Sequence, residues 1–303
     1  MTLDIDIDCS VIIVTYKREE FLVNTIAKFD EIFKYNSKYE LLIINQNSDL
    51  NEQKILKNRP WLKYWNLSQP GMVAARNFGL KNANGKIVLY VDDDVEPLKD
   101  LIKEHIVAYC DESVGGVAGR IIEGLESEVK NKNQDSLIHP VYGWERISFN
   151  HQVPCEVMTS RGCNMSFKKD LLIKIGGFDN NIKIFRDDTE ICFRVRKEGF
   201  RIWFAPKAGL YHLNAKTGGT RSSNKHKLGP IKKEIEMYYY CHRHYRDNLY
   251  FILKHLRGLV LVRSLWSSYF IYVGFSRWPW RVLGKNIAFI LAFFNAIINL
   301  RKI

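Results

Sequence analysis

Runs of consecutive apolar residues alternate with helical patterns along the first two thirds of the chain. The first run, residues 9–15, is rich in β-branched side chains, which is typical of a strand covered on both faces. A pattern of helical period follows over 19–33. The sequence then predicts strands at 41–44, 62–66 and 86–91, and a helix that begins near Gly71 and ends before Gly85. This alternation predicts an α/β fold around a mainly parallel sheet.

The next part of the sequence continues the alternation, with one interruption. We predict helices at 98–110, 169–175 and 187–198, and strands at 116–122, 156–159 and 201–205. Residues 123–153 are polar and lack periodicity, which indicates a long loop or lid, and loops of this length in compact domains are usually functional. From residue 230 onward the pattern is helical, over 232–256, 258–275 and 281–300. The chain therefore divides into a body, 1–229, and a helical region, 230–303.

Charge separates these two parts of the chain. The whole chain carries a net charge of +12. From residue 213 onward there are 16 Lys and Arg and three acidic residues, a net charge of +13, so the first 212 residues carry −1. The acidic start, residues 1–8, has no apolar stretch of the kind found in secretory signal peptides. Six cysteines without a CxxC pair are typical of reduced thiols in the cytoplasm.

Three aspartates, Asp92, Asp93 and Asp94, directly follow the strand predicted at 86–91. In open α/β sheets, ligands bind at the carboxyl ends of the strands. Carboxylates are also the ligands that Mg²⁺ and Mn²⁺ prefer, and these ions are commonly shared with substrate phosphates. A solvated acidic turn is the alternative, and the position after a buried strand argues against it. We therefore predict a metal and phosphate site here.

A second group of carboxylates opens the helix predicted at 187–198. Asp187 is placed to cap this helix, and acidic residues in a first turn also compensate the helix dipole. Asp188 and Glu190 are not both needed for that purpose, so a catalytic base is plausible here. Further along, a lone histidine, His212, ends an apolar segment, and such a histidine is more often structural than a ligand. The segment that follows, with Arg221, is suited to closing over a phosphate.

Together these segments resemble the family 2 glycosyltransferases of the GT-A fold. The resemblance covers residues 9 to about 221, and its motifs occur in the family's order. They are Thr15-Tyr16-Lys17-Arg18, Gly71 followed by Ala75-Arg76-Asn77, Asp92-Asp93-Asp94, Gly162-Cys163-Asn164-Met165-Ser166, Gly176-Gly177-Phe178-Asp179, Asp187-Asp188, and Pro206 with Ala208 and His212. The resemblance implies a GT-A body, a mostly parallel sheet flanked by helices, which the C-terminal helical region extends.

The resemblance also implies roles for individual residues. Asp94 is expected to bind the metal directly and His212 to be a second metal ligand, which reverses the structural interpretation of that histidine. Asp188 matches the usual catalytic base. Positions that the same motifs assign to the nucleotide sugar are Thr15, Tyr16, Arg18, Asn45, Arg76, Asp92 and Asp93. Further candidates for the substrate site are Trp144, Gly162, Asp187, Arg194 and Arg221.

Two positions depart from the family pattern. Asp187 stands where the family usually has Glu. The base at Asp188 is therefore kept, and the side chain before it is shorter than in the family. Asn45 stands where the family usually has the Asp that contacts the nucleobase. An Asn carbonyl still accepts a hydrogen bond from the N3–H of uracil or thymine. We therefore expect a UDP- or dTDP-sugar as the donor, with Mn²⁺ or Mg²⁺ as the metal.

The implied activity is a metal-dependent transfer of a hexosyl group with inversion at the anomeric carbon. Two other functions stay open, a non-catalytic GT-A-fold assembly partner and a nucleotidyltransferase. A protein that had lost catalysis would have little reason to keep Asp94, Asp188 and His212 together. A nucleotidyltransferase needs a glycine-rich phosphate loop after the first strand, and residues 15–18 contain no glycine.

The basic helical region is also rich in aromatic residues, such as Trp266, Trp278 and Trp280, which is typical of helices at membrane interfaces. Its most apolar segment, Ile287 to Leu300, has 14 residues, and a membrane span needs about 20. We therefore expect the region to lie on an anionic membrane surface, at the cytoplasmic face of the cell membrane. That location implies a lipid-linked glycan acceptor, such as a polyprenyl-diphosphate oligosaccharide of cell-envelope polysaccharide biosynthesis.

Two alternatives for this region stay open. Its apolar face would also suit packing on the body, or on a second copy in a homo-oligomer. Basic and aromatic residues occur together in nucleic-acid-binding proteins as well, but here the charge is not part of a recognisable nucleic-acid module, so no nucleic acid is expected. The sequence does not identify the sugar, the nucleobase or the acceptor hydroxyl.

Overall fold

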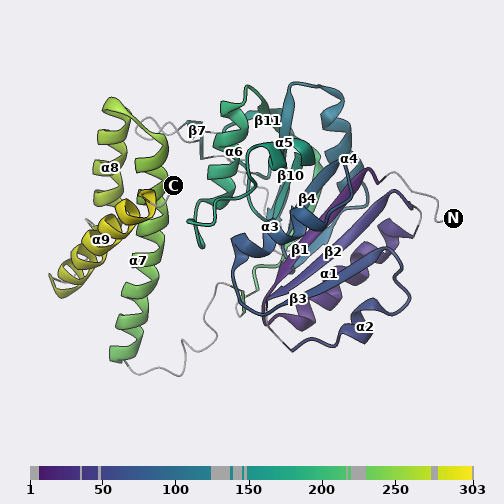
Figure 1. The fold of residues 1–303 in the computed structure, drawn as a ribbon, viewed down its shortest axis with the longest axis horizontal. Coiled ribbons are helices and arrows are strands. Elements are labelled where there is room, and N and C mark those ends of the chain that lie inside the picture. The colour runs from purple at the N-terminus through teal and green to yellow at the C-terminus, as the bar shows by residue number, and fades with distance from the viewer. Residues whose placement is uncertain are drawn as a thin grey trace.

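The computed structural model describes residues 7–34, 36–46, 49–123, 137–138, 145–146, 149–215, 218–219, 230–273 and 279–301. A central sheet is surrounded by helices, and three long helices lie together beside this body (Figure 1). The α/β class predicted from the sequence is therefore confirmed.

The central sheet has nine strands in the order β3-β2-β1-β4-β10-β6-β11-β5, and β9 pairs with β11. Four neighbouring strands are parallel: β1 (Cys9–Thr15), β2 (Tyr39–Gln46), β3 (Leu62–Leu67) and β4 (Ile87–Val91). Strands β6 and β11 also pair in parallel. The other strands are β5 (Val95–Pro97), β6 (Val114–Glu123), β9 (Cys155–Val157), β10 (Asn164–Lys168) and β11 (Arg201–His212). Two short strands outside this sheet, β7 (Leu137–Ile138) and β8 (Glu145–Arg146), pair with each other.

The helices of the body pack against this sheet. They are α1 (Glu19–Phe33), α2 (Glu52–Leu56), α3 (Met72–Asn82), α4 (Leu101–Val107), α5 (Lys169–Lys174) and α6 (Asp187–Lys197), and a 3₁₀ turn at Ala108–Cys110 extends α4. Nearly every residue of β1 and β4 is buried, as expected for strands with helices over both faces. The bounds predicted for β1 and α1 agree with the structure, because both segments have a clear apolar period.

Two strands were harder to predict from the sequence. Strand β10 has buried polar side chains at Asn164 and Ser166, so its sequence lacks an apolar run. His105 of α4 forms hydrogen bonds with both side chains. Its Nε2 lies 2.8 Å from Asn164 Oδ1, and its Nδ1 lies 2.9 Å from Ser166 Oγ. Strand β11 continues to residue 212, past the predicted end at 205, because an irregularity between Ala205 and Gly209 lets the strand run on.

Three C-terminal helices complete the described chain: α7 (Pro230–His255), α8 (Gly258–Val273) and α9 (Pro279–Leu300). Helix α9 packs on α7 through the small side chains Ala288, Ala292 and Ala296, which are buried in one cluster with Tyr245. Their spacing of four residues places them on one face of α9.

The apolar stretch of α9 is longer than the sequence interpretation allowed. The segment Val282–Leu300 has 19 residues with a mean hydropathy of 1.6, so its length and composition alone would allow it to cross a membrane. The estimate of 14 residues, which began at Ile287, was therefore wrong. The helix already begins at Pro279, and the single charge of Lys285 does not interrupt its apolar pattern.

The second half of α7 is fixed to the body by a buried carboxylate. Asp247 is fully buried, and its Oδ2 accepts hydrogen bonds from the backbone N–H groups of Lys183, Ile184 and Phe185 at 3.2, 2.9 and 3.1 Å. Its Oδ1 accepts a bond of 2.9 Å from Arg246 Nε. Asp247 therefore holds the backbone of the segment that leads into α6.

A second buried carboxylate, Glu190 of α6, fixes the end of α7. Lys254 Nζ and His255 Nε2 lie 3.1 and 3.0 Å from its Oε1, and Arg194 Nη2 lies 2.7 Å from its Oε2. Burial alone would raise the pKa of Glu190, but His255 and Arg194, helped by Lys254, lower this pKa to about 2. The ionised carboxylate therefore connects α6 to α7.

We predict that Glu190→Gln lowers the free energy of unfolding by about 3 kcal/mol at neutral pH, because it removes the charge from a buried network of cations. The pKa of Glu190 is lower in the folded state, so this contribution is present above the unfolded value of 4.5 and is lost as the pH falls toward about 2. Urea unfolding of both proteins at several pH values measures the difference.

The matched control is Glu156→Gln, which removes the same charge from an exposed pair with Arg196. It should leave the midpoint of unfolding unchanged. If Glu190→Gln lowers the free energy of unfolding equally at neutral and acidic pH, the ionised carboxylate of Glu190 is not what stabilises the contact between α6 and α7.

Candidate active site

A cleft of about 630 Å³ opens at the carboxyl ends of β1, β2 and β4. Tyr16 and Gln46 line it beside β1 and β2. The three aspartates that follow β4 line it next to His212, the last residue of β11. Helix α7 adds Arg243 and other basic residues to the wall. The cleft thus lies where an open α/β sheet binds ligands.

Asp93, the middle aspartate, is held inside the protein. Its Oδ2 accepts a 2.6 Å hydrogen bond from the Thr15 hydroxyl, and its Oδ1 accepts a 2.9 Å bond from Arg18 Nη1. The Thr25 hydroxyl lies 2.9 and 2.8 Å from the backbone carbonyl oxygens of Asp93 and Val95 and can donate to either. Burial raises the pKa of Asp93 to about 6, against the opposing effects of Arg18 and Thr15. Asp93 therefore fixes the turn on which its two neighbours lie.

Asp94 is buried, and its two carboxylate oxygens differ in their hydrogen bonds. Its Oδ2 accepts a 2.8 Å bond from the Ala215 N–H, and Arg18 Nη1 lies 3.4 Å from the same oxygen. Its Oδ1 accepts no well-formed hydrogen bond from the described residues, although His212 Nε2 lies at 3.4 Å. Burial alone would raise the pKa of Asp94, but His212, the Ala215 N–H and Arg18 lower it.

His212 is surrounded by carboxylates. Its Nε2 lies 3.8 Å from Asp92 Oδ2 and 3.4 Å from Asp94 Oδ1, and its Nδ1 lies 3.7 Å from Glu123 Oε2. Burial alone would lower the pKa of His212, but Asp94 and Glu123 raise it to about 9. The carboxylates around the imidazole therefore strongly favour a positive charge at this place. A bound metal ion would supply that charge as well as a proton does.

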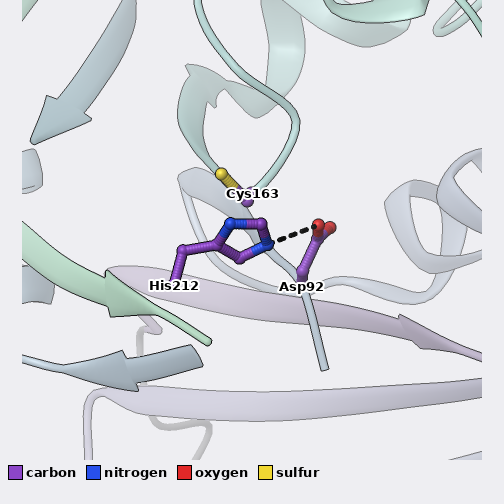
Figure 2. A group of neighbouring side chains, drawn as sticks. All are labelled: Asp92, Cys163 and His212. Carbon is purple, nitrogen blue, oxygen red and sulfur yellow. Dashed lines mark ion pairs between the residues drawn. The ribbon is translucent and has the colours of Figure 1, made fainter. Parts of the chain in front are cut away.

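One ligand atom from each of Asp92, Cys163 and His212 lies within 4.8 Å of the others (Figure 2). Figure 2 shows the His212 ring directed at the carboxylate of Asp92, with Cys163 on a neighbouring loop. With the open oxygen of Asp94, this group offers two carboxylates and an imidazole, a donor set that suits Mn²⁺ or Mg²⁺. A divalent cation thus fits here. The sequence analysis did not expect Cys163 at a metal site, because its spacing from the other cysteines forms no metal-binding pattern.

Arg76 links the aspartate turn to the start of α6. Its Nη1 pairs with Asp187 Oδ2, and its Nη2 lies 3.3 Å from the Gly162 carbonyl and 3.9 Å from Asp92 Oδ1. A Cβ at position 162 would lie 2.5 Å from Arg76 Nη2, so only glycine leaves room for this guanidinium. Burial raises the pKa of Asp187 to about 6, even though Arg76 opposes this rise.

Asp188 is the more accessible of the two carboxylates at the start of α6. Its Oδ2 accepts a 3.3 Å bond from the Gly162 N–H, and its Oδ1 accepts a 2.6 Å bond from the Thr189 N–H. Asp187 is buried and paired with Arg76. Two backbone N–H groups therefore hold the predicted base in one orientation, and no cationic side chain among the described residues is paired with it.

Some predicted site residues lie away from the cleft. The Asn45 amide donates 3.0 Å bonds to Tyr64 Oη and Asn66 Oδ1 on β3. Its neighbour Gln46 points to the other face of the sheet and lines the cleft instead. Arg194 is bound to Glu190 and to backbone carbonyls near α5. Trp144 and Arg221 lie outside the described residues.

The largest addition to the predicted site comes from α7 and the segment that it holds. Lys183, His242, Arg243 and Arg246 line the cleft, although the sequence pattern assigned 230–303 to a separate region. No local motif marks these residues, because their place depends on α7 returning to the body. The clustering of positive charge after residue 213 is the one sequence signal that relates to them.

The sheet order, with paired carboxylates after β4 and a histidine at the end of β11, agrees with the GT-A fold. Residues 10–176 match the sequence model of Glycosyl transferase family 2, which covers more than half of the chain. The chain therefore belongs to this family.

Known relatives agree with this assignment. The probable glycosyltransferase YdaM of Bacillus subtilis (strain 168) is 24% identical over 225 residues, which are 69% of this chain and 51% of that protein. This chain thus spans about half the length of that relative. Among solved structures, residues 1–349 of S. aureus TarS superpose with a TM-score of 0.62 at 16% identity, covering 96% of this chain and 81% of that one.

A second solved structure is similar over the whole chain. The mannosyltransferase PcManGT from Pyrobaculum calidifontis, in complex with GDP-Man and Mn²⁺, has a TM-score of 0.56 at 16% identity. The similarity covers 100% of this chain and 82% of that one. At this level of identity, the two structures establish the GT-A fold.

Proposed function

We propose that this protein is a glycosyltransferase that uses a divalent metal to transfer a hexosyl group, with inversion, from a nucleotide-diphosphate sugar to a hydroxyl of a lipid-linked glycan. One observation carries this proposal. The buried Oδ1 of Asp94 accepts no well-formed hydrogen bond from the described residues, and it lies beside His212, which in turn lies beside Asp92. The mannosyltransferase neighbour holds Mn²⁺ and a nucleotide sugar, which supports the same chemistry here.

The donor would lie along the cleft. Asp94, His212 and Asp92 would hold Mn²⁺ or Mg²⁺, which neutralises the charge of a departing diphosphate when bound. Tyr16 and Gln46 lie beside β1 and β2, where they would contact the nucleoside. We retain a UDP- or dTDP-sugar as the proposed donor, and TarS has been solved with UDP-GlcNAc.

Asp188 would act as the general base. The acceptor hydroxyl gives its proton to Asp188 while its oxygen attacks the anomeric carbon, and the bond from that carbon to the diphosphate oxygen breaks. The N–H groups of Gly162 and Thr189 hold the carboxylate in place. Arg76 pairs with the adjacent Asp187, so the negative charge of that neighbour is balanced.

We predict that Asp188→Asn lowers the turnover rate about 10²- to 10⁴-fold, because an amide cannot accept the proton. Binding of the nucleoside diphosphate should stay unchanged. Release of nucleoside diphosphate from a panel of nucleotide sugars, in the presence of a membrane lipid fraction, measures the rate.

Asp111→Asn is the control, since it changes an exposed carboxylate far from the cleft. It should keep the rate of the native protein. Turnover by Asp188→Asn at nearly the native rate would show that another group is the base.

The surface of α8 and α9 supports a membrane location. Its exposed apolar side chains are Leu259, Val260, Val262, Trp266, Phe270, Leu283, Ile287, Ile290, Leu291, Phe294 and Ile298. The same helices carry Arg263 and Lys285, and each basic residue near an anionic leaflet contributes about 1 kcal/mol. The opposite face of α9 is occupied by α7. We therefore propose that α9 lies in the cytoplasmic surface of the membrane with one face in lipid.

We predict that the triple variant Ile290→Asn/Leu291→Asn/Phe294→Asn binds lipid vesicles at least about 100-fold more weakly, because three apolar side chains no longer enter the lipid. These side chains are exposed, so the fold should be retained. Co-sedimentation with vesicles of phosphatidylglycerol and phosphatidylcholine measures binding. The comparison variant, Arg263→Gln/Lys285→Gln, should lose only the part of vesicle binding that depends on salt concentration.

Unchanged vesicle binding by the triple variant would contradict the membrane assignment. If the native protein is instead a dimer and the triple variant a monomer, the apolar face is an interface between two copies.

A further inference from the structure

The backbone just before α6 has an unusual conformation. Arg186, the residue before the helix, has φ 75° and ψ 7°, in the left-handed region that is unfavourable for a residue with a Cβ. Its carbonyl accepts a 2.8 Å hydrogen bond from the Glu190 N–H, one of the first bonds of the helix. The conformation of Arg186 therefore sets the direction in which α6 begins, and contacts from elsewhere must maintain it.

Two adjacent residues of α7, Asp247 and Asn248, supply such contacts. We call them the α7 pair. Asp247 Oδ2 accepts hydrogen bonds from the three backbone N–H groups of residues 183–185. Asn248 Oδ1 accepts a 3.1 Å bond from Arg186 Nε. Both side chains of the α7 pair are buried. Four consecutive residues before α6 are thus bound to two consecutive residues of α7.

The side chains of the α7 pair are themselves fixed. Arg246 Nε donates a 2.9 Å bond to Asp247 Oδ1. The Asn248 amide nitrogen lies 3.0 Å from the buried Ser268 Oγ of α8. Because a guanidinium can only donate, the Asn248 oxygen must face Arg186, and the amide nitrogen then faces the serine hydroxyl. The orientation of the Asn248 amide therefore follows from its two partners.

Helix α7 also contacts α6 a second time. Lys254 and His255, which bind Glu190, lie two helical turns after the α7 pair, so these residues share one face of α7. Helix α7 therefore holds α6 at Arg186, just before the helix, and again at Glu190. The short stretch between these two anchors contains the proposed base, Asp188.

We propose that the α7 pair positions the base by holding Arg186 in its left-handed conformation. The inference rests on the proposed glycosyl transfer with Asp188 as the base. Asp188 Oδ1 is bound to the N–H of Thr189, which moves with the helix, and its bond to the Gly162 N–H is long, at 3.3 Å. The place of the carboxylate therefore depends on where α6 begins. The α7 pair acts through this backbone, so its members are positioning residues.

The test compares the full-length native protein with Asn248→Ala and with Asn248→Ala/Arg186→Gly. Asn248→Ala removes the partner of the Arg186 side chain, and its turnover rate should fall at least about tenfold, because a reacting group displaced by about 1 Å can cost about 10²-fold in rate. Glycine adopts a positive φ without steric cost, so the double variant should recover to within about threefold of the native rate.

Turnover is the release of nucleoside diphosphate from the nucleotide sugar that the native protein uses best, in the presence of a membrane lipid fraction. Calorimetric affinity for the same nucleoside diphosphate with Mn²⁺ should be unchanged in every variant, so the loss lies in kcat. Circular dichroism monitors folding. The matched control, Asn286→Ala, removes an Asn side chain that bonds Tyr269 between α8 and α9, and it should keep the native rate.

A second comparison does not depend on the folding of Asn248→Ala. Arg186 is only partly buried, and Arg186→Gly should turn over at least about tenfold faster than Arg186→Ala, because only glycine keeps the left-handed backbone without the anchor. Equal rates for these two variants would overturn the inference. So would a native rate for Asn248→Ala, or a double variant no faster than Asn248→Ala. A native protein that releases no nucleoside diphosphate from any nucleotide sugar would instead refute the proposed function, and the inference with it.

Discussion

The candidate active site depends on the burial of one carboxylate, Asp93. Its two oxygens are occupied by Thr15 of β1 and by Arg18 in the segment that leads into α1, so the ends of two parallel strands are joined at the site. A carboxylate without these partners would be costly to bury. Because Asp93 points inward, the residues before and after it, Asp92 and Asp94, are directed toward His212. The pairing of Asp93 therefore determines where a metal would be held.

A comparable arrangement connects the C-terminal helices to the catalytic body. Asp247 of α7 holds the backbone of residues 183–185, and Glu190 of α6 holds the last turn of α7. Both carboxylates are fully buried. As a result, the helix that carries the proposed base lies beside α7, and α9 packs on α7.

The sequence predicts the parts of this structure that are encoded locally. Strand β1 and helix α1 have clear apolar periods, and the aspartates after β4 belong to a recognisable motif. By contrast, β10 was missed because its buried Asn164 and Ser166 depend on His105, which is distant in the sequence. The basic residues that line the cleft reach it through tertiary contacts alone; they are Lys183, His242, Arg243 and Arg246. Asn45 occupies the expected motif position, but the pleat of β2 directs Gln46 into the cleft instead.

The central claim is that Asp94 helps to hold a metal that binds the diphosphate of a nucleotide. The most direct test is calorimetric titration of UDP, dTDP, GDP and CDP into the native protein and into Asp94→Ala, each with and without Mn²⁺. The account predicts that at least one nucleotide binds the native protein in an Mn²⁺-dependent way, and that its affinity falls at least about 100-fold in Asp94→Ala. Binding that is equally tight in both proteins, or that does not depend on Mn²⁺, would contradict it.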